Sequence, residues 1–283
     1  MATFDFGDGL GPVAAHQHLN GGGWVADTAT VAVTAFVDSG AVVFGTAQVT
    51  NTAKVYGQAR VYGLAVVSSS AQIYGLAEIF GSAQIQDNAQ VYDNAQVYDT
   101  AIVTGSSQVF DDAIVRDSAM VSGSAKIFGS AEIINSAIVT ENSSVSGGIV
   151  QDNAQILGSA VIEDVAVISQ RAKIYGSAHI SGSALVSQGA KVYGDSKVIG
   201  NAVLNGDVQV FGAATIRDNA KMYGNTQACG TATLYGNAQL LGKASVKDNS
   251  RVGGDVVLQG AAVVGGNVEI DDSTVIEGNT ILV

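Results

Sequence analysis

The feature that most constrains this chain is a six-residue period that occupies nearly all of its length. One series of aliphatic residues at every sixth position runs from Val25 to Val145, and a second runs from Val150 to Leu282. Almost all of these 44 positions hold Val, Ile or Leu. Chance does not produce such a pattern, so the chain is an array of short structural repeats.

We number each hexad from its aliphatic residue, which is slot one. Slot three is mostly Gly, Asp or Asn, and slot five is nearly always Ala. A period of six does not fit the 3.6-residue period of a helix, but it fits a short strand followed by a sharp turn. Slot one then points inward, slot five fills a corner, and slot three tolerates the backbone bend. The exceptions at slot five include Ser107, Ser143, Ser196, Val208, Thr226 and Thr274.

Three hexads make one triangular coil of 18 residues, and the outward slot two tests this spacing. At steps of 18, one slot-two column is aromatic: Tyr56, Tyr74, Tyr92, Phe110 and Phe128. Another is polar: Thr50, Ser68, Gln86, Thr104, Ser122 and Thr140. A six-residue repeat without three-sided coils would have mixed the two.

The pattern predicts an all-β, single-stranded parallel β-helix, or β-solenoid, with about 14 triangular coils. The repeat, in which an aliphatic residue is followed four positions later by a small one, resembles the sequence pattern of the hexapeptide-repeat family of left-handed β-helices. This resemblance covers residues 24 to 283. The left hand is implied by this resemblance, because parallel crossovers are otherwise right-handed. GGGWV followed by hexads such as QVYDNA also resembles long, regular repeat proteins of bacteria and their phages.

Two regions depart from the regular hexads. Residues 1 to 23 lack the repeat but contain apolar side chains, so we expect a cap over the amino-terminal edge. Within the repeat region, 24 to 283, the spacing between Val145 and Val150 drops to five, and Gly147 and Gly148 can absorb the missing residue. This one-residue slip is either a tolerated deletion or a change in the face that carries the aromatic side chains.

The surfaces suggest assembly. The last hexad would leave an open backbone edge, which invites pairing with another chain. The aromatic columns could stack on themselves, contact a second subunit or contact sugar rings. We therefore expect a homo-oligomer or filament formed through the carboxy-terminal edge or an aromatic face. The candidate interface residues are Tyr56, Tyr74, Tyr92, Phe110, Phe128, Tyr175, Tyr193, Phe211, Ile281, Leu282 and Val283.

Charge and composition narrow the partners and the setting. With 25 acidic and 13 basic residues the net charge is −12, which disfavours nucleic acid. The first residues, MATFDFGDGL, do not resemble a secretory signal, and no apolar stretch is long enough to span a membrane. We expect cytoplasmic synthesis, with a virion or cell-surface destination left open. A lone Cys229 cannot form an intrachain disulfide.

Many proteins of the resembled family are acyltransferases with a catalytic His near a cleft between subunits. Here His179 is the only histidine of the repeat region. A three-histidine metal site, as in the related γ-carbonic anhydrases, would need His16 and His18 as well. We predict no enzyme, metal or cofactor, and a structural or adhesive rod, such as a phage fibre, virion decoration or bacterial surface component. The alternative is a divergent hexapeptide acyltransferase.

Overall fold

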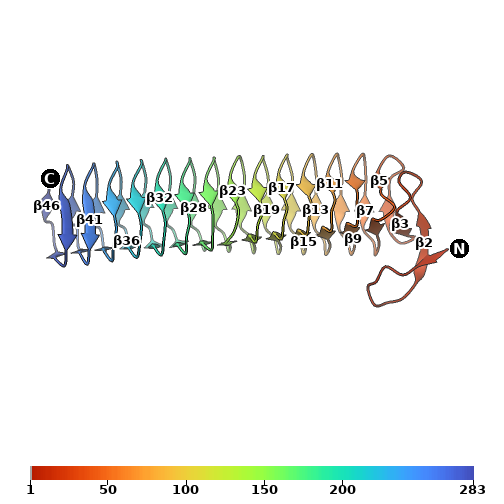
Figure 1. Ribbon diagram of the computed structural model, residues 1–283, viewed down its shortest axis with the longest axis horizontal. Helices are drawn as coiled ribbons and strands as arrows, with labels where there is room; N and C mark the ends of the chain where they lie inside the picture. Colours follow the sequence, from red (N-terminus) through yellow and green to blue (C-terminus); the bar gives the residue numbers. More distant parts are fainter. Residues whose placement is uncertain (1) are drawn as a thin grey trace. The chain divides into compact units, whose positions relative to one another are not determined.

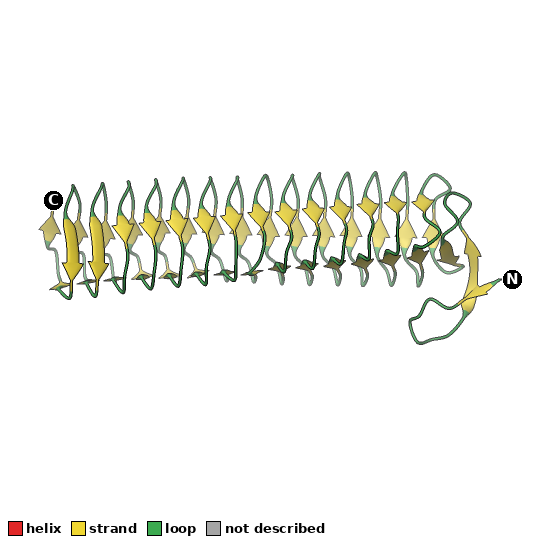
Figure 2. Ribbon diagram, viewed as in Figure 1, coloured by secondary structure: helices red, strands yellow, loops and turns green. Residues whose placement is uncertain are grey.

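The computed structural model describes residues 2–283 as short strands joined by tight turns, with no helix among them (Figure 2). It forms two compact units, of which unit 1 ends at Glu141 and unit 2 begins at Asn142. In each unit a strand pairs in parallel with the strand one coil later, so each coil contributes to three faces (Figure 1). The predicted left-handed parallel β-helix is confirmed in its all-β, parallel, three-sided architecture. Residues 2–283 include no helix of the length and apolarity that a membrane crossing needs.

Unit 1 presents three faces of short parallel strands. Face 1A consists of β3 (Trp24–Ala26), β6 (Val42–Val43), β9 (Arg60–Val61), β12 (Glu78–Ile79), β15 (Gln96–Val97), β18 (Ile114–Val115) and β21 (Glu132–Ile133). Face 1B consists of β4 (Thr30–Val31), β7 (Gln48–Val49), β10 (Val66–Val67), β13 (Gln84–Ile85), β16 (Ile102–Val103), β19 (Met120–Val121) and β22 (Ile138–Val139). Face 1C consists of β5 (Phe36–Val37), β8 (Lys54–Val55), β11 (Gln72–Ile73), β14 (Gln90–Val91), β17 (Gln108–Val109) and β20 (Lys126–Ile127).

Unit 2 is built in the same way. Face 2A consists of β24 (Ile149–Val150), β27 (Val167–Ile168), β30 (Leu185–Gln188), β33 (Val203–Gly206), β36 (Lys221–Gly224), β39 (Gln239–Leu240), β42 (Val257–Leu258) and β45 (Val275–Ile276). Face 2B consists of β25 (Gln155–Ile156), β28 (Lys173–Ile174), β31 (Lys191–Val192), β34 (Gln209–Val210), β37 (Gln227–Ala228), β40 (Ser245–Val246), β43 (Val263–Val264) and β46 (Ile281–Leu282). Face 2C consists of β23 (Ser144–Val145), β26 (Val161–Ile162), β29 (His179–Ile180), β32 (Lys197–Val198), β35 (Thr215–Ile216), β38 (Thr233–Leu234), β41 (Arg251–Gly254) and β44 (Glu269–Asp272).

The amino-terminal segment forms a small antiparallel addition to unit 1 (Figure 1, red). Strand β1 (Thr3–Phe4) pairs with β2 (Val13–Gln17), and β2 pairs in turn with β3. The ring of Phe4 stacks on Trp24 at 4.7 Å, and Phe6 stacks on Phe44 at 4.9 Å. These contacts attach the segment to the first coils by aromatic packing as well as by strand pairing.

The interior of each unit is a column of slot-one and slot-five side chains. Across the regular coils these side chains have no exposed surface, as Ile127 and Ala131 in unit 1 and Ile174 and Ala178 in unit 2 illustrate. Burial of each slot-one aliphatic side chain contributes about 1.5–3 kcal/mol. The predicted division of the hexad into inward, corner and outward positions is thereby confirmed.

The turns depend on slot three. Most residues in this slot have a positive, left-handed φ, whether they are Gly or not: Gly129 has a φ of 61° and Asp111 one of 56°. A Cβ added to Gly105 would lie 2.6 Å from the carbonyl oxygen of Gly123 in the next coil. Glycine is therefore favoured at slot three by φ and, at positions such as 105, by the closeness of the next coil as well.

The shortened hexad lies within unit 2. Ser144 pairs with Val161, an offset of 17 residues, whereas Ile149 pairs with Val167 at the usual 18. Gly148 has a φ of 72°, and a Cβ there would lie 2.2 Å from the carbonyl oxygen of Ala166. The turn therefore absorbs the deletion, and β23 and β24 both keep their parallel partners.

A charge in the interior column should disrupt folding of unit 1. Ile127 is fully buried, so we expect Ile127→Asp to cost about 4 kcal/mol or more, because the carboxylate would have no partner. The matched control is Lys126→Asp, on the exposed residue beside it on β20. Urea denaturation followed by circular dichroism should show a large loss of stability for the first variant only. Similar midpoints for the two variants would contradict the assignment of slot one.

One corner position carries an unsatisfied polar group. Thr226 occupies slot five in unit 2, has no exposed surface, and its Oγ1 makes no hydrogen bond among residues 2–283. Ser196, also at slot five, donates its hydroxyl to the carbonyl oxygen of Tyr193 at 2.9 Å. Val208 already occupies the slot-five position one coil before Thr226. A valine therefore fits this corner of the coil.

We expect Thr226→Val to stabilise the protein by about 1 kcal/mol, because it removes a buried hydroxyl that has no partner and keeps the side-chain volume. Ser196→Ala, which removes a hydroxyl that has a partner, should be neutral or destabilising. The shift of the urea midpoint measures both effects. A loss of stability in Thr226→Val would mean that the hydroxyl has a partner in solution.

Candidate interaction surfaces

The predicted aromatic column of unit 1 forms a continuous stack on face 1C. Tyr74, Tyr92, Phe110 and Phe128 have ring centroids 4.7–4.9 Å apart and interplanar angles of 3° or less. Tyr56 instead makes a tilted contact with Phe36, at 5.3 Å and 44°. The structure therefore brings four of the five predicted residues into one parallel ladder.

A second ladder, on face 1A, was not predicted. Its stacked pairs are Phe44–Tyr62 at 4.8 Å, Tyr62–Phe80 at 5.0 Å and Phe80–Tyr98 at 4.6 Å. The Tyr62 hydroxyl donates to Glu78 at 3.3 Å, and burial together with the Glu78 charge raises the pKa of Tyr62 to about 12. The same 18-residue spacing, read along the third slot-two column, would have revealed this ladder.

In unit 2 the predicted residues Tyr175, Tyr193 and Phe211 stack on face 2B, with centroids 4.7 and 5.1 Å apart. In all three ladders an internal ring has both of its faces covered by its neighbours. A sugar ring needs a free aromatic face for stacking, so only the end rings could offer one. The geometry favours self-stacking, which stabilises the pairing of coils, over glycan stacking along the ladder.

Face 2C contains a different aromatic arrangement. Two guanidinium groups contact the Tyr235 ring, with Cζ of Arg217 4.8 Å and Cζ of Arg251 5.5 Å from the ring centroid. A Cβ at Gly253 would lie 2.1 Å from Cζ of Tyr235, so the ring lies directly over this glycine. Glycine is required at position 253 because any side chain there would displace the ring.

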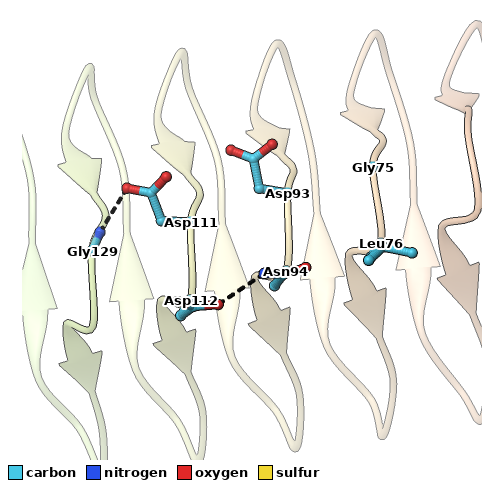
Figure 3. A pocket seen from close by; sticks show the side chains of 7 residues that line it. All are labelled: Gly75, Leu76, Asp93, Asn94, Asp111, Asp112 and Gly129. Atoms are coloured by element: carbon cyan, nitrogen blue, oxygen red, sulfur yellow. Dashed lines mark hydrogen bonds between the residues drawn. The ribbon is translucent and has the colours of Figure 1, made fainter.

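A shallow, open depression lies beside the face 1C ladder (Figure 3). It is lined by Gly75, Leu76, Asp93, Asn94, Asp111, Asp112 and Gly129. Asn94 Nδ2 donates to Asp112 at 2.9 Å, and the Gly129 N–H donates to Asp111 at 3.0 Å. Burial raises the pKa of Tyr74 and Tyr92, and the nearby charge of Asp93 raises both further. The ladder therefore has a negatively charged border.

The Asp111–Gly129 bond belongs to a recurring pattern. An Asp at slot three accepts a hydrogen bond from the slot-three N–H of the next coil, as Asp164 does from Gly182 at 2.8 Å and Asp248 from Gly266 at 2.9 Å. In the described coils, the slot-three N–H makes none of the coil-to-coil backbone hydrogen bonds that lie outside the strands. Aspartate at slot three therefore adds a coil-to-coil bond that glycine cannot make.

The histidines lie in separate environments. The ring of His179 contacts Glu163 at 2.9 Å on the surface of unit 2, and His179 lines none of the depressions named above. His16 pairs with Asp27 at 2.8 Å, whereas the buried His18 bonds the carbonyl oxygen of Ala35 at 3.1 Å. Among residues 2–283, no group of three or more His, Cys, Asp or Glu side chains is placed to hold a metal ion.

Cys229 is a partly buried residue at the end of the face 2B aromatic column. Burial raises the pKa of its thiol, and the charge of Asp248 raises it further. A protonated thiol is a poor nucleophile, so these surroundings do not activate the cysteine.

Ile281 and Leu282 form β46, which pairs with β43, and Val283 follows this strand. Ile281 is 64% exposed and Val283 77% exposed. Their role in an interface stays a prediction. Comparison with protein-family models and with curated proteins found no match for this chain.

The pKa of one slot-three carboxylate provides a test of the coil-to-coil bonds. Asp87 accepts from the Thr104 hydroxyl at 2.5 Å and from the Gly105 N–H at 3.1 Å, and these bonds lower its pKa below the ordinary 3.8. A pKa that is lower in the folded protein means that the ionised form adds stability above the unfolded-state pKa. That stability is lost as pH falls through the folded-state pKa.

We expect Thr104→Val to raise the pKa of Asp87 toward its ordinary value, because the hydroxyl makes the largest contribution to the shift. The measurement is an NMR titration of the carboxyl carbon. Thr50→Val is the matched control, since Thr50 lies in the same column and its hydroxyl bonds Asn51 instead. An Asp87 pKa that is the same in both variants would contradict this hydrogen bond.

Proposed function

We propose that this protein is a structural β-solenoid that assembles with copies of itself, or with another protein, through the flat faces of its coils. The observation that carries the proposal is face 1B, on which no outward strand side chain is charged. These side chains are Thr30, Ala32, Gln48, Thr50, Val66, Ser68, Gln84, Gln86, Ile102, Thr104, Met120, Ser122, Ile138 and Thr140. Unit 1 otherwise carries 13 acidic and 4 basic residues, a net charge of −9.

Face 1B combines apolar side chains with polar groups, several of which have hydrogen-bond partners. Met120 is 38% exposed and lies between Ile102 and Ile138 along one column. In the polar columns, the hydroxyls of Ser122 and Thr140 are 2.7 Å apart. Burying such a face removes apolar surface from water and leaves few polar groups without a partner, so its desolvation costs little.

The charge of unit 1 also makes face 1B the most favourable surface for contact between copies. Two copies of an acidic unit repel each other, and the repulsion is weakest where the approaching faces carry no charge. With strands about 4.8 Å apart and roughly 12 Å wide, the face covers about 400 Å², against ~800 Å² per partner in a standard interface. Face 1B alone therefore supports a weak, reversible contact, and a stable assembly needs a further surface.

The hexads support two further parts of the proposal. Their resemblance to the hexapeptide-repeat family supports assigning this β-solenoid to that family. The resemblance to repeat proteins of bacteria and phages supports a role as a virion fibre, a virion decoration or a bacterial surface component. Mass spectrometry of purified particles and cell envelopes tests this setting, and absence of the protein from both would overturn it.

Charges placed on face 1B should weaken self-association. We expect the double variant Ile102→Lys, Ile138→Lys to associate about tenfold more weakly than wild type, because its lysines must be desolvated. The control Gln96→Lys, Ile114→Lys introduces two lysines on face 1A and should associate like wild type. Sedimentation velocity over a concentration series measures both, with circular dichroism to confirm folding. Wild-type protein that stays monomeric throughout, or equal association of the two variants, would overturn the proposal.

A further inference from the structure

The basic residues of this acidic protein are concentrated in one stretch. Residues 171 to 251 contain nine basic and four acidic side chains, a net charge of +5. Three of the cations, Arg171, Lys173 and Lys191, are exposed and lie on or beside face 2B. Within the part of the chain that the structure describes, none of the three has an ion pair or a side-chain hydrogen bond.

Two of these three cations repel each other. Lys173 and Lys191 are directly paired in register on neighbouring parallel strands, so their ammonium groups repel each other. They flank the ladder that starts with Tyr175 and Tyr193. Two adjacent cations beside an apolar ladder form a surface that an anionic partner with its own apolar surface would stabilise. We call Arg171, Lys173, Lys191 and this ladder the basic surface.

Unit 1 offers a surface with the opposite charge. Asp93, Asp111 and Asp112 line the depression beside the Tyr74–Tyr92 ladder (Figure 3). Asp93 and Asp112 are exposed, and among the described residues the side-chain carboxylate of Asp93 accepts no hydrogen bond. We call these three carboxylates and the adjoining ladder the acidic surface.

The two surfaces also share a repeat. The ring centroids of Tyr74 and Tyr92 are 4.7 Å apart, and those of Tyr175 and Tyr193 are also 4.7 Å apart. Asp93 and Asp112 likewise follow strands of successive coils, and Lys173 and Lys191 lie on strands of successive coils. Contacts that form between one coil of each copy can therefore form again at the next coil. A partner whose groups repeat at a different distance could not make such repeated contacts.

We propose that the basic surface of one copy docks on the acidic surface of a second copy. This inference rests on the proposed self-assembly and supplies the additional surface that face 1B lacks. Lys173 and Lys191 pair with Asp93 and Asp112, and the edges of the two ladders pack beside the charges. Each copy carries one surface of each kind, so the contact is heterologous: it either closes a ring or propagates as a filament.

The test uses charge reversal with complementation. Lys173→Glu, Lys191→Glu reverses the basic surface, and Asp93→Lys, Asp112→Lys reverses the acidic surface. A long side chain is tolerated at slot three, since Gln170 adopts a φ of 59° there. The matched control, Lys197→Glu, Lys243→Glu, makes the same charge change at exposed positions away from the basic surface.

Sedimentation velocity of the full chain should show wild-type association that weakens as salt is raised. Each surface variant should associate about tenfold more weakly, and the control should associate as strongly as wild type. An equimolar mixture of the two surface variants should regain association, because reversed charges on one variant match those on the other.

The outcomes separate the inference from the proposed function. Association that survives both reversals but is lost in Ile102→Lys, Ile138→Lys would overturn the inference and leave the proposed assembly intact. A wild-type protein that does not associate at low salt would overturn both. Failure of the mixture to recover would also overturn the inference. The inference would also be overturned if a thymidine oligonucleotide bound in a way that depends on Lys173 and Lys191 while self-association did not depend on them.

Discussion

The burial of one aliphatic and one small side chain in each hexad is the constraint on which the rest of the structure depends. Slot one and slot five fill the interior of every regular coil, and neither position leaves room for a charged side chain. The coils must then stack at a fixed offset so that each aliphatic residue lies over its equivalent. The shortened hexad illustrates how strict this is, because a glycine turn absorbs the deletion while the strands on both sides keep their pairing.

In-register stacking determines the chemistry of the surface. Because residue i lies over residue i+18, outward positions form columns, and a column of one residue type becomes a ladder. Aromatic ladders gain stacking energy, and an aspartate column gains bonds to the backbone of the next coil. Two lysines in register gain only repulsion, and this is why we propose a partner for Lys173 and Lys191.

These columns are also the basis of the proposed assembly. The groups with shifted pKa values are ladder tyrosines, Tyr235, turn aspartates and the partly buried Cys229, and burial or hydrogen bonding within the coils is the main cause of each shift. His179 is paired with Glu163 on an outer face. Face 1B, the basic surface and the acidic surface are all periodic, with one repeat in each coil. Such surfaces match partners of the same repeat, and another copy of this chain is one such partner.

The sequence by itself determined the hexad, the three-sided coil, the site of the deletion and most of the face 1C ladder, because a period of six or 18 is visible without knowing any contact. Only the tertiary structure decided how outward side chains are used. Tyr56 turns toward Phe36, Tyr235 lies over Gly253, and Asp87 bonds the next coil. The physical reason is that every inward position has the same requirement, burial, in each hexad. The contacts of an outward side chain depend instead on its neighbours in other coils, which are far away in the sequence and differ from coil to coil.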